Sequence, residues 1–396
     1  AFHSPNRPSH RHRMSASCPA ASVGHPRLTG LKSLPVLMYH YVSRRKNSIA
    51  VHPDTFESHC RSMRRAGWTG IGLAEAEAYL LGQAPLPPRS ALITFDDGFL
   101  DNYVYAWPIL KKYGHKGVIF AVAGKLEQGT PRPTLDDVRA GRIREDGLPR
   151  VDAPYVRHEL GFDERKDLFC NWEEMRLMEA DGAMAVAAHS HWHRAVFAKP
   201  EYTGFHAPGH RSRTFDRVDF AVPWGLPAFA QRPALLRRAF VPDPQLVDAI
   251  RVLVPQDKAE AYAFFQDSGK VRELEALVAT FAAAPPGLGA YESDADRTDR
   301  MTRELSACAA TLADELGHPV RSLCWPWGAY CDEARDIARA QGFSVFFATT
   351  MGPNPPGCAA HVHRFKAKDK PGSWLLLRLF LYSRPWLAGL YAKMRL

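Results

Sequence analysis

Residues 91–98 read ALITFDDG, a short apolar run that ends in two adjacent aspartates and a glycine. The apolar run is typical of a buried strand, and the glycine indicates a tight turn at its end. Two neighbouring carboxylates in a partly desolvated site raise each other's pKa unless a cation lies close by. We therefore expect Asp96 and Asp97 to bind a metal ion and to exchange protons, and we expect the other metal ligands elsewhere in the chain.

A second apolar run, residues 183–188, leads directly into the sequence HSHWH at residues 189–193. Histidines four residues apart can lie on the same face of one helical turn and bind one ion through their imidazole nitrogens. With Asp97, His189 and His193 form a set of two histidines and one carboxylate, which leaves positions open for water and substrate. The competing interpretation is a pair of helix-capping aspartates and two ordinary surface histidines.

These motifs, TFDDG and HSxxH, resemble those of the polysaccharide deacetylases of the NodB-homology group, carbohydrate esterase family 4. Residues 323–330, LCWPWGAY, resemble the third motif of that family, an aromatic-proline-aromatic-glycine sequence at the rim of its groove. Residues 35–42, PVLMYHYV, resemble the opening of the subgroup that de-N-acetylates poly-N-acetylglucosamine, whose motif order is circularly permuted. The resemblance extends from about residue 34 to residue 365 and is interrupted by segments without a counterpart.

The resemblance implies a role for each polar residue. Asp97, His189 and His193 would bind one divalent metal ion, with zinc as the expected ion, and Asp96 would be the base that deprotonates the attacking water. In the subgroup, the histidine of the opening motif protonates the leaving amine, and the matching residue is His40.

Two other histidines compete with His40 for the role of the acid. His361 and His363 lie late in the chain, where the unpermuted members of the family keep their acid histidine. A single histidine after a strand can also be purely structural, so the sequence leaves this assignment open.

The third motif is expected to bind substrate. Its backbone from Trp327 to Tyr330 could supply an N–H group to the developing oxyanion, with Trp325 and Trp327 as walls for the sugar and Tyr330 beside them. Tryptophans in a proline-glycine turn can equally be core residues, and this alternative stays open.

Strands and helices alternate along the rest of the chain. Phe56, Cys60 and Met63 recur at helical spacing after Pro53, and residues 118–122 are rich in the branched and aromatic side chains typical of strands. Further strands are expected at residues 34–42 and 68–73, and helices at residues 101–113, 172–180 and 293–316. The alternation predicts an α/β sheet closed or nearly closed into a barrel. The resemblance implies the distorted (β/α) barrel of the NodB-homology type.

Three parts are expected along the chain: a disordered segment at residues 1–30, a catalytic domain at residues 31–366 and a basic amphipathic segment at residues 367–396. A large, mainly helical insertion is expected at about residues 195–290, beginning with aromatic-rich coil. Residues 125–170 are expected to form a long loop near the site.

Composition narrows the class of protein. The 396 residues are 46% apolar, enough for a substantial core, and the seven cysteines form no CxxC pair. This cysteine usage, with no visible export signal, favours a reducing compartment. The net charge is +9, but from Arg364 onward eight basic residues and one aspartate contribute +7 of it, so nucleic acid is not an expected partner.

The basic C-terminal segment carries leucine and aromatic side chains between its charges. Such a segment suits the surface of an anionic membrane, and the alternative is a helix packed on the barrel. We expect a cytoplasmic protein peripherally associated with the inner membrane, with a periplasmic location as the alternative.

The expected activity is that of a metal-dependent N-deacetylase. It would hydrolyse the acetamido group of an amino sugar in a glycan or a lipid-linked saccharide and release acetate. Two alternatives remain: a metal-dependent amidase that acts on a non-sugar amide, and a glycan-binding protein without activity.

Overall fold

A computed structural model describes most of the chain beyond residue 29. The described residues are 30–45, 47–152, 155–158, 161–165, 167–209, 218 and 220–395. The disordered segment expected at residues 1–30 therefore falls outside the described residues, apart from Gly30.

The short apolar runs of the sequence form one parallel sheet. Within the described residues its strands pair in the order β15-β14-β9-β6-β5-β1-β16, and β4 pairs with β5. Strands β5 and β6 are buried along their whole length, as expected for parallel strands covered on both faces. The strands are β1 (Val36–Tyr39), β4 (Thr69–Gly70), β5 (Ser90–Phe95), β6 (Gly117–Ala121), β9 (Met184–Ala188), β14 (Ser322–Cys324), β15 (Val345–Phe347) and β16 (Phe365–Lys366).

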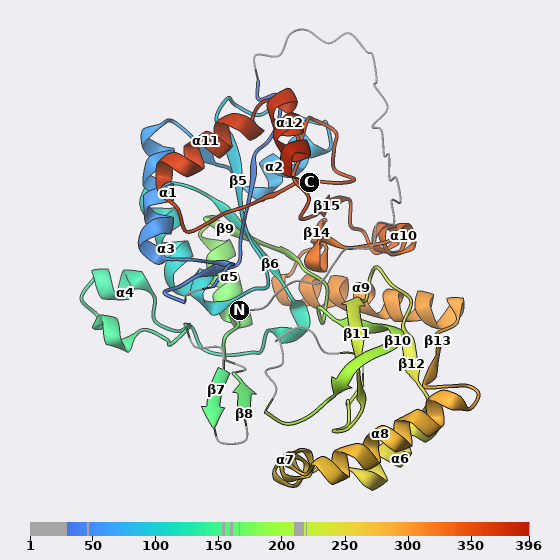
Figure 1. The fold of residues 1–396 in the computed structure, drawn as a ribbon. Coiled ribbons are helices and arrows are strands. Elements are labelled where there is room, and N and C mark those ends of the chain that lie inside the picture. Colours follow the sequence, from blue (N-terminus) through green and yellow to red (C-terminus); the bar gives the residue numbers. More distant parts are fainter. Residues whose placement is uncertain are drawn as a thin grey trace.

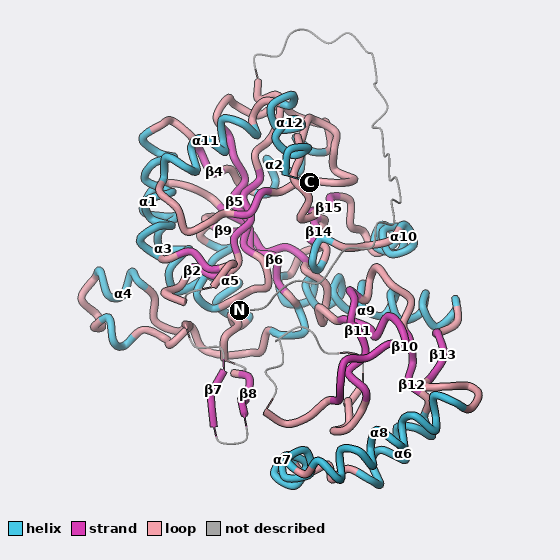
Figure 2. The backbone as a smooth tube through the Cα atoms, viewed as in Figure 1, coloured by secondary structure: helices cyan, strands magenta, loops and turns pink. Residues whose placement is uncertain are grey.

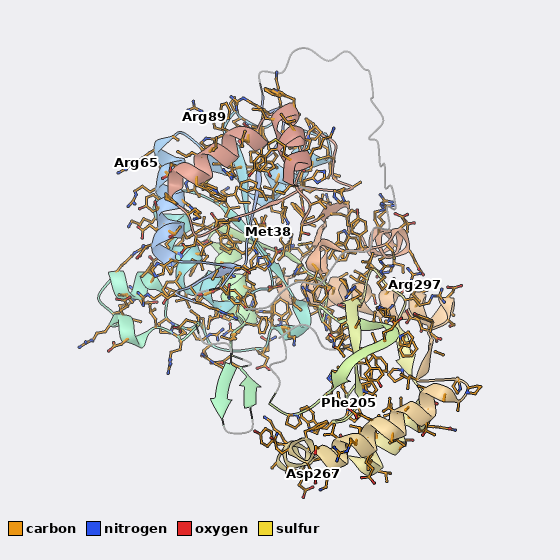
Figure 3. All side chains as sticks on the ribbon, viewed as in Figure 1. Met38, Arg65, Arg89, Phe205, Asp267 and Arg297 are labelled. Carbon is orange, nitrogen blue, oxygen red and sulfur yellow. The ribbon has the colours of Figure 1, made fainter. Side chains whose placement is uncertain are left out.

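One segment near the end of the chain joins the two edges of this sheet. Val362 pairs in parallel with Phe347 of β15, and β16 pairs with β1 a few residues later. The sheet therefore curves round on itself. Met38 of β1 is labelled near the centre of this part of the molecule in Figure 3. The predicted barrel is confirmed, and its first and last strands are neighbours.

Helices surround the sheet (Figures 1 and 2). Helix α1 buries Phe56, Cys60 and Met63, as predicted. The strand expected at residues 68–73 is only two residues long, and the helix expected at residues 101–113 begins with a π-helical turn, η1 (Asn102–Ala106). The helices are α1 (Pro53–Arg65), α2 (Leu73–Leu80), α3 (Trp107–Tyr113), α5 (Trp172–Ala180), α9 (Asp294–Leu316) and α10 (Asp332–Ala340).

The segment between β6 and α5 contains several short elements. It is held beside the turn that follows β5, because Leu100 N–H donates to Leu168 O (2.7 Å) and Cys170 N–H donates to Gly98 O (2.9 Å). The elements are η2 (Ala123–Lys125), α4 (Leu135–Arg139), η3 (Glu145–Gly147), β7 (Tyr155–His158) and β8 (Gly161–Glu164). A second small pair, β2 (Tyr41–Val42) and β3 (Ala50–Val51), follows β1.

The insertion has its own hydrophobic core and contains strands as well as helices. Its first part contains two paired antiparallel strands and not only the expected coil. Phe197 and Phe229 pack against each other across these strands, with ring centroids 5.3 Å apart. The elements are β10 (Ala195–Phe205), β11 (Pro227–Pro233), β12 (Phe240–Pro242), β13 (Gly289–Tyr291), α6 (Pro244–Leu253), α7 (Lys258–Gln266) and α8 (Ser268–Ala283).

Two helices end the chain, α11 (Gly372–Tyr382) and α12 (Pro385–Arg395). Helix α11 buries Leu375 and Leu379 in the main core, and it lies along α1 (Figure 1). Across the described residues, no helix combines the length and apolar character needed to cross a membrane.

Candidate active site

The four sequence motifs meet at one end of the barrel. His40 follows β1, Asp96 and Asp97 follow β5, His189 follows β9, and the third motif follows β14. The carboxyl ends of parallel strands lie at the same end of a barrel, which is where active sites of (β/α) barrels are usually found.

The three predicted metal ligands form one buried group. His189 Nε2 lies 3.3 Å and His193 Nε2 lies 3.7 Å from Asp97 Oδ1, and all three side chains are almost fully buried. Nitrogen and oxygen ligands about 2.0–2.2 Å from a tetrahedral ion are roughly 3.3–3.6 Å from one another. The three residues therefore fit a single divalent ion.

The histidine loop is not the helical turn that the spacing suggested. Ser190 and His193 adopt left-handed backbone conformations, with φ of 65° and 53°, which an α-helix does not allow. Ser190 Oγ accepts a hydrogen bond from the N–H of His193 (3.0 Å). A bend, stabilised by this contact, brings both imidazoles to Asp97.

Glu304 of α9 holds the middle of the same loop. Its carboxylate accepts hydrogen bonds from the N–H groups of His191 (3.0 Å) and Trp192 (2.8 Å). Burial is the main influence on this carboxyl and raises its pKa, opposed by these hydrogen bonds. The sequence offered no signal for this contact, because Glu304 is more than a hundred residues away from the loop.

The orientation of His189 is set by a contact on its other nitrogen. Nδ1 lies 2.8 Å from Cys324 O, and since a carbonyl oxygen only accepts, Nδ1 must carry the proton. The lone pair of Nε2 is then free to face an ion beside Asp97.

Asp96 forms a buried ion pair that the sequence did not reveal. Arg364 NH1 and NH2 donate to its two oxygens at 2.6 and 2.8 Å, and both side chains are buried. Burial alone would raise the pKa of Asp96, but the guanidinium outweighs burial and holds this pKa well below its usual value. Asp96 is therefore an ionised carboxylate in a dry environment.

A second group of possible ligands, Asp96, His189 and Cys324, overlaps the first at His189. Arg364 already occupies both oxygens of Asp96, and its NH2 lies 2.9 Å from Cys324 Sγ. A cation at this position would face the guanidinium, so the group of Asp97, His189 and His193 is the better metal site.

Of the three histidines considered for the acid, His40 is the one that lies beside Asp96. Its Nε2 lies 3.9 Å from Asp96 Oδ2, and burial lowers its pKa while Asp96 and Asp97 oppose this effect.

The two competing histidines lie elsewhere. Thr350 Oγ1 is hydrogen-bonded to His361 Nε2 (2.8 Å) and to His363 Nδ1 (2.9 Å). Arg364, the residue after His363, is the one that reaches Asp96 from this segment.

The third motif places its aromatic residues in different environments. Trp325 is fully buried and stacks on Tyr330 and Phe346, so it is a core residue and not a wall for a sugar. Trp327 is 37% exposed, and its ring centroid lies 4.2 Å from that of His193.

Tyr330 is half-buried, and its hydroxyl is hydrogen-bonded to His361 Nδ1 (2.8 Å). In the turn, the N–H groups of Gly328 and Ala329 donate to Trp325 O and Pro326 O, so these two N–H groups are not open to an oxyanion. A side chain at Gly328 would collide with Thr349, which explains the glycine.

The barrel, with the predicted metal-ligating residues at the carboxyl ends of its strands, has the architecture of a NodB-type (β/α) barrel. Residues 83–207 match the model of the polysaccharide deacetylase family. Over 93 residues the chain is 42% identical to YxkH of Bacillus subtilis (strain 168), a protein that carries this family's name; the match spans 24% of this chain and 33% of that protein. The predicted resemblance to polysaccharide deacetylases is thereby confirmed.

Solved structures support the same fold over most of the chain. The de-N-acetylase from Aggregatibacter actinomycetemcomitans superimposes with a TM-score of 0.55 at 18% identity, covering 87% of this chain and 99% of that one. The BpsB deacetylase domain from Bordetella bronchiseptica (TM-score 0.53, 20% identity) covers 86% and 98% of the two chains. IcaB from Ammonifex degensii (TM-score 0.50, 22% identity) covers 88% and 96%. These similarities confirm the predicted barrel.

Proposed function

We propose that this protein is a metal-dependent N-deacetylase that removes N-acetyl groups from amino sugars of a glycan or a lipid-linked saccharide and releases acetate. The observation that carries the proposal is the group formed by Asp97, His189 and His193 beside the ionised Asp96. The match to the polysaccharide deacetylase family over the same stretch supports the acetamido group as the target.

The metal site is the first requirement of this reaction. The mixed nitrogen and oxygen ligands at near-tetrahedral spacing suit zinc, the ion that we propose. A divalent ion bound there would polarise the acetyl carbonyl and make water more acidic.

Asp96 is the proposed base. It accepts a proton from the attacking water as the water oxygen bonds to the carbonyl carbon, and Arg364 keeps the carboxylate ionised and in place beforehand. The C–N bond then breaks, and the amine nitrogen must gain a proton before it leaves.

His40 is the proposed acid. Its Nε2 lies 3.9 Å from Asp96. The proposed base, which accepts a proton from water, and the proposed acid, which donates a proton to the amine, are therefore neighbours. Trp327, exposed and beside His193, is the aromatic residue that we propose contacts the sugar.

The direct test is release of acetate from oligomers of N-acetylglucosamine. We expect release by the purified protein, loss of release after metal chelation and its recovery with added zinc. Asp96→Asn should keep the bound metal and lose the rate, whereas Asp97→Ala, His189→Ala and His193→Ala should each lose both. Full activity of His193→Ala would contradict the proposed site.

The same assay separates the two alternatives. An amidase for non-sugar amides would release acetate from N-acetylated amino acids but not from the oligomers. A glycan-binding protein without activity would bind the oligomers and release nothing.

We also propose that the protein docks on an anionic membrane surface through α12. Trp386, Leu390 and Met394 are 70, 53 and 69% exposed, and their spacing of four residues places them on one face of the helix. The two C-terminal helices and the turn between them carry Arg378, Arg384 and Lys393, and no acidic residue occurs between residues 372 and 395. Such a surface suits interfacial binding without a membrane span.

A cavity and further basic residues lie beside this surface. A cavity of about 720 Å³ lies between the C-terminal helices and the amino ends of the strands, lined by Trp68, Phe380 and Trp386 together with Lys32 and Arg89. Arg65 and Arg89 lie at the same end of the barrel (Figure 3). We propose peripheral association with the cytoplasmic face of the inner membrane.

A further inference from the structure

The cavity of about 720 Å³ beside α12 is enclosed by several parts of the fold. Leu31 precedes β1 and Trp68 precedes β4, whereas Leu376 and Phe380 belong to α11 and Trp386 belongs to α12. Ligand sites in proteins usually have volumes of roughly 300–1,000 Å³ and are mostly apolar, with a few polar groups. The cavity is therefore large enough to enclose part of a ligand, which the exposed face of α12 alone cannot do.

The apolar lining extends from the core to the surface. Trp68 is buried in the main hydrophobic core, and Leu31 is buried in a second core cluster. Phe380 and Trp386 are exposed. A hydrocarbon chain in contact with these side chains would remove apolar surface from water, which is favourable. The apolar part of the cavity thus suits an acyl chain.

Three basic side chains line the same cavity, Lys32, Arg89 and Arg384, and its described lining includes no acidic residue. Within the part of the chain that the structure describes, none of the three forms an ion pair with a carboxylate. The two guanidinium groups contact neutral oxygens, because Arg89 NH1 donates to Ala66 O (3.0 Å) and Arg384 NH1 donates to Phe380 O (2.9 Å). The lining therefore carries a net positive charge.

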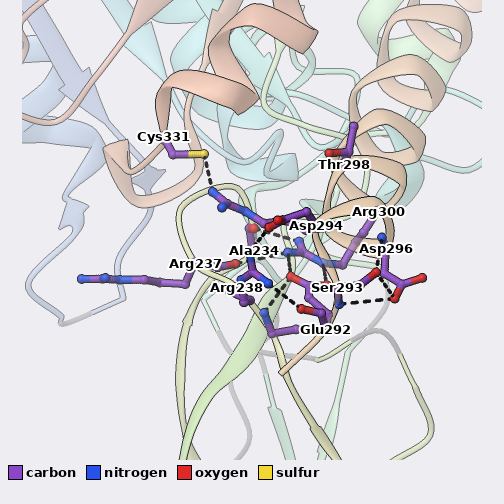
Figure 4. Close-up of polar contacts among 12 residues, drawn as sticks. Ala234, Arg237, Arg238, Glu292, Ser293, Asp294, Asp296, Thr298, Arg300 and Cys331 are labelled. Atoms are coloured by element: carbon purple, nitrogen blue, oxygen red, sulfur yellow. Dashed lines mark hydrogen bonds and ion pairs between the residues drawn. The ribbon is translucent and has the colours of Figure 1, made fainter. Parts of the chain in front are cut away.

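Other arginines of the fold are paired with carboxylates. Where the insertion meets α9, the guanidinium of Arg300 donates to both carboxylate oxygens of Glu292 (2.9 and 2.7 Å), and Arg238 forms an ion pair with Asp294 (Figure 4). These pairs neutralise the charge inside the protein. No described residue does the same for the basic side chains of the cavity, so a ligand that supplies a negative charge is complementary to them.

Arg89 is held beside the cavity by its neighbours. A side chain at Gly67 would come within 3.1 Å of Arg89 NH1, so this glycine leaves the guanidinium room to reach Ala66 O. The backbone of Arg89 is left-handed, with φ of 63°, which is uncommon for a residue other than glycine. A guanidinium that is already in place keeps further N–H groups for a second partner, and phosphate is an anion that arginine binds well.

We propose that this cavity binds one anionic phospholipid, with the phosphate against the three basic side chains and an acyl chain against the aromatic ones. The proposal rests on the proposed association with a membrane and assigns a defined lipid site to it. One lipid molecule binds per protein, and both its charge and its chain contribute. Docking through the exposed face of α12 alone needs no such stoichiometry.

The N-terminal part of the chain fits the cavity less well than a lipid does. Gly30 lines the cavity, so residues 1–29 lead directly to it. These residues contain four arginines and no acidic residue. Their charge has the same sign as that of the cavity, and like charges repel each other.

The test is a calorimetric titration of the full chain with dihexanoyl phosphatidylglycerol, kept monomeric so that no membrane is present. We expect saturable binding of one lipid per protein. Dihexanoyl phosphatidylcholine has the same chains and no net charge, and it should bind about 5-fold more weakly or worse. Inorganic phosphate lacks the chains and should also bind more weakly. The assignment is wrong if monomeric phosphatidylglycerol does not bind, or if either of the other two ligands binds as tightly.

Lys32→Glu tests the charge of the cavity. It should weaken binding of the anionic lipid by about 5-fold or more, the effect of one basic residue on an anionic lipid. Lys270→Glu is the matched control, because it makes the same change of charge at an exposed lysine of α8, outside the cavity. Equal affinities of the two variants would contradict the proposed phosphate site.

Two substitutions in α12 separate the cavity from the exposed helix face. Trp386 and Leu390 are both exposed apolar residues, but of the two only Trp386 lines the cavity. Trp386→Ser should weaken binding of the monomeric lipid, and Leu390→Ser should leave it unchanged. Both should weaken binding to vesicles that contain phosphatidylglycerol. An equal loss of monomer binding in the two variants would place the lipid on the helix face and not in the cavity.

Vesicle co-sedimentation keeps the lipid site separate from the proposed membrane association. If the protein binds the vesicles but not the monomeric lipid, the association stands and the lipid site falls. If it binds the monomeric lipid, loses this binding in Lys32→Glu and does not bind the vesicles, the lipid site stands and the association falls.

Discussion

At the scale of single residues, the pair of Asp96 and Arg364 explains how a buried carboxylate stays ionised. Arg364 also donates to Thr94 Oγ1 (3.1 Å) and to Ala348 O (2.8 Å), so its guanidinium is satisfied on several sides. Such a satisfied pair is tolerated in the interior, whereas one partner left alone is costly. Arg364 is one of the eight basic residues of the C-terminal region, but its burial removes it from any surface patch.

The pair predicts a non-additive effect on stability. Arg364→Met should lower the free energy of unfolding by about 3–5 kcal/mol, because it leaves the Asp96 carboxylate buried and unpaired. The double variant with Asp96→Asn should lose less, since both charges are gone. Urea unfolding of the four proteins measures the coupling, with the exposed pair Asp248 and Arg251 as a control worth about 1 kcal/mol or less. Costs that simply add would show that the pair is not coupled.

The identity of the general acid can also be tested by substitution of single residues. His40→Ala should lower kcat by about 10²–10⁴-fold with unchanged metal content, the usual size of general acid catalysis. His361→Ala and His363→Ala should stay near the wild-type rate, because their rings are bonded to Thr350. Initial rates at saturating oligomer decide the matter, and the reverse ranking would move the acid to the C-terminal histidines.

At the scale of elements, a single histidine joins three parts of the barrel. His59 of α1 accepts a hydrogen bond at Nδ1 from the Tyr39 hydroxyl of β1 (2.9 Å) and donates from Nε2 to Lys370 O (2.7 Å), just before α11. Both contacts need the neutral ring, because the lone pair of Nδ1 is used as an acceptor. Burial lowers the pKa of His59 from its usual value near 6.5.

This contact predicts a dependence of stability on pH. As the pH falls below about 6.5, the unfolded chain protonates His59 while the folded chain does not, so unfolding becomes easier by up to about 1.4 kcal/mol per pH unit. Above that pH the contribution of the neutral His59 is fully present. His59→Gln keeps a donor and an acceptor but does not titrate, so its stability should fall less steeply between pH 7.5 and 5.5. Urea unfolding at several pH values compares the two, and parallel curves would exclude His59 as the cause.

At the scale of the whole molecule, the proposed active site and the proposed membrane-binding surface lie at opposite ends of the barrel. The metal ligands follow the carboxyl ends of the strands, whereas Trp68 and Arg89, which line the cavity beside the C-terminal helices, precede β4 and β5. The insertion and the β7–β8 hairpin lie toward the catalytic end, and α11 and α12 toward the other (Figure 1). A protein docked through α12 would therefore present its site away from the bilayer.

This geometry predicts that membrane binding and catalysis are separable. The triple substitution Trp386→Ser, Leu390→Ser and Met394→Ser should weaken binding to vesicles with anionic lipid by roughly 10-fold or more, because it removes the apolar contacts. Salt should release the wild type only in part, since screening leaves apolar insertion intact. Vesicle co-sedimentation measures both effects. The rate on soluble oligomers should not change.

The control for this experiment is Val252→Ser, an exposed apolar side chain on α6. Substitution is a sharper test than removal of the C-terminal segment, because α11 buries Leu375 and Leu379 in the core and its loss would disturb the barrel. Equal co-sedimentation of the triple variant and the wild type would show that α12 is only a helix packed on the barrel.

Much of the site was predictable because its information is local. The carboxylates after β5, the two histidines after β9 and His40 after β1 each follow an apolar run, and the ends of parallel strands converge in space. The helix of residues 172–180 and the apolar stripe of α1 follow equally from spacing and capping. Each of these features depends on fewer than about fifteen consecutive residues, so it can be recognised from the sequence alone.

Only the tertiary structure decided the contacts between distant parts of the chain. Arg364 pairs with a carboxylate 268 positions earlier, and Glu304 holds a loop more than a hundred positions earlier. The burial of Trp325 and the exposure of Trp327 depend on which side chains pack against the motif, and the bend at His193 replaces the helical turn that spacing alone favours. Pairings of this kind are set by closure of the barrel, which juxtaposes segments that carry no pattern in common.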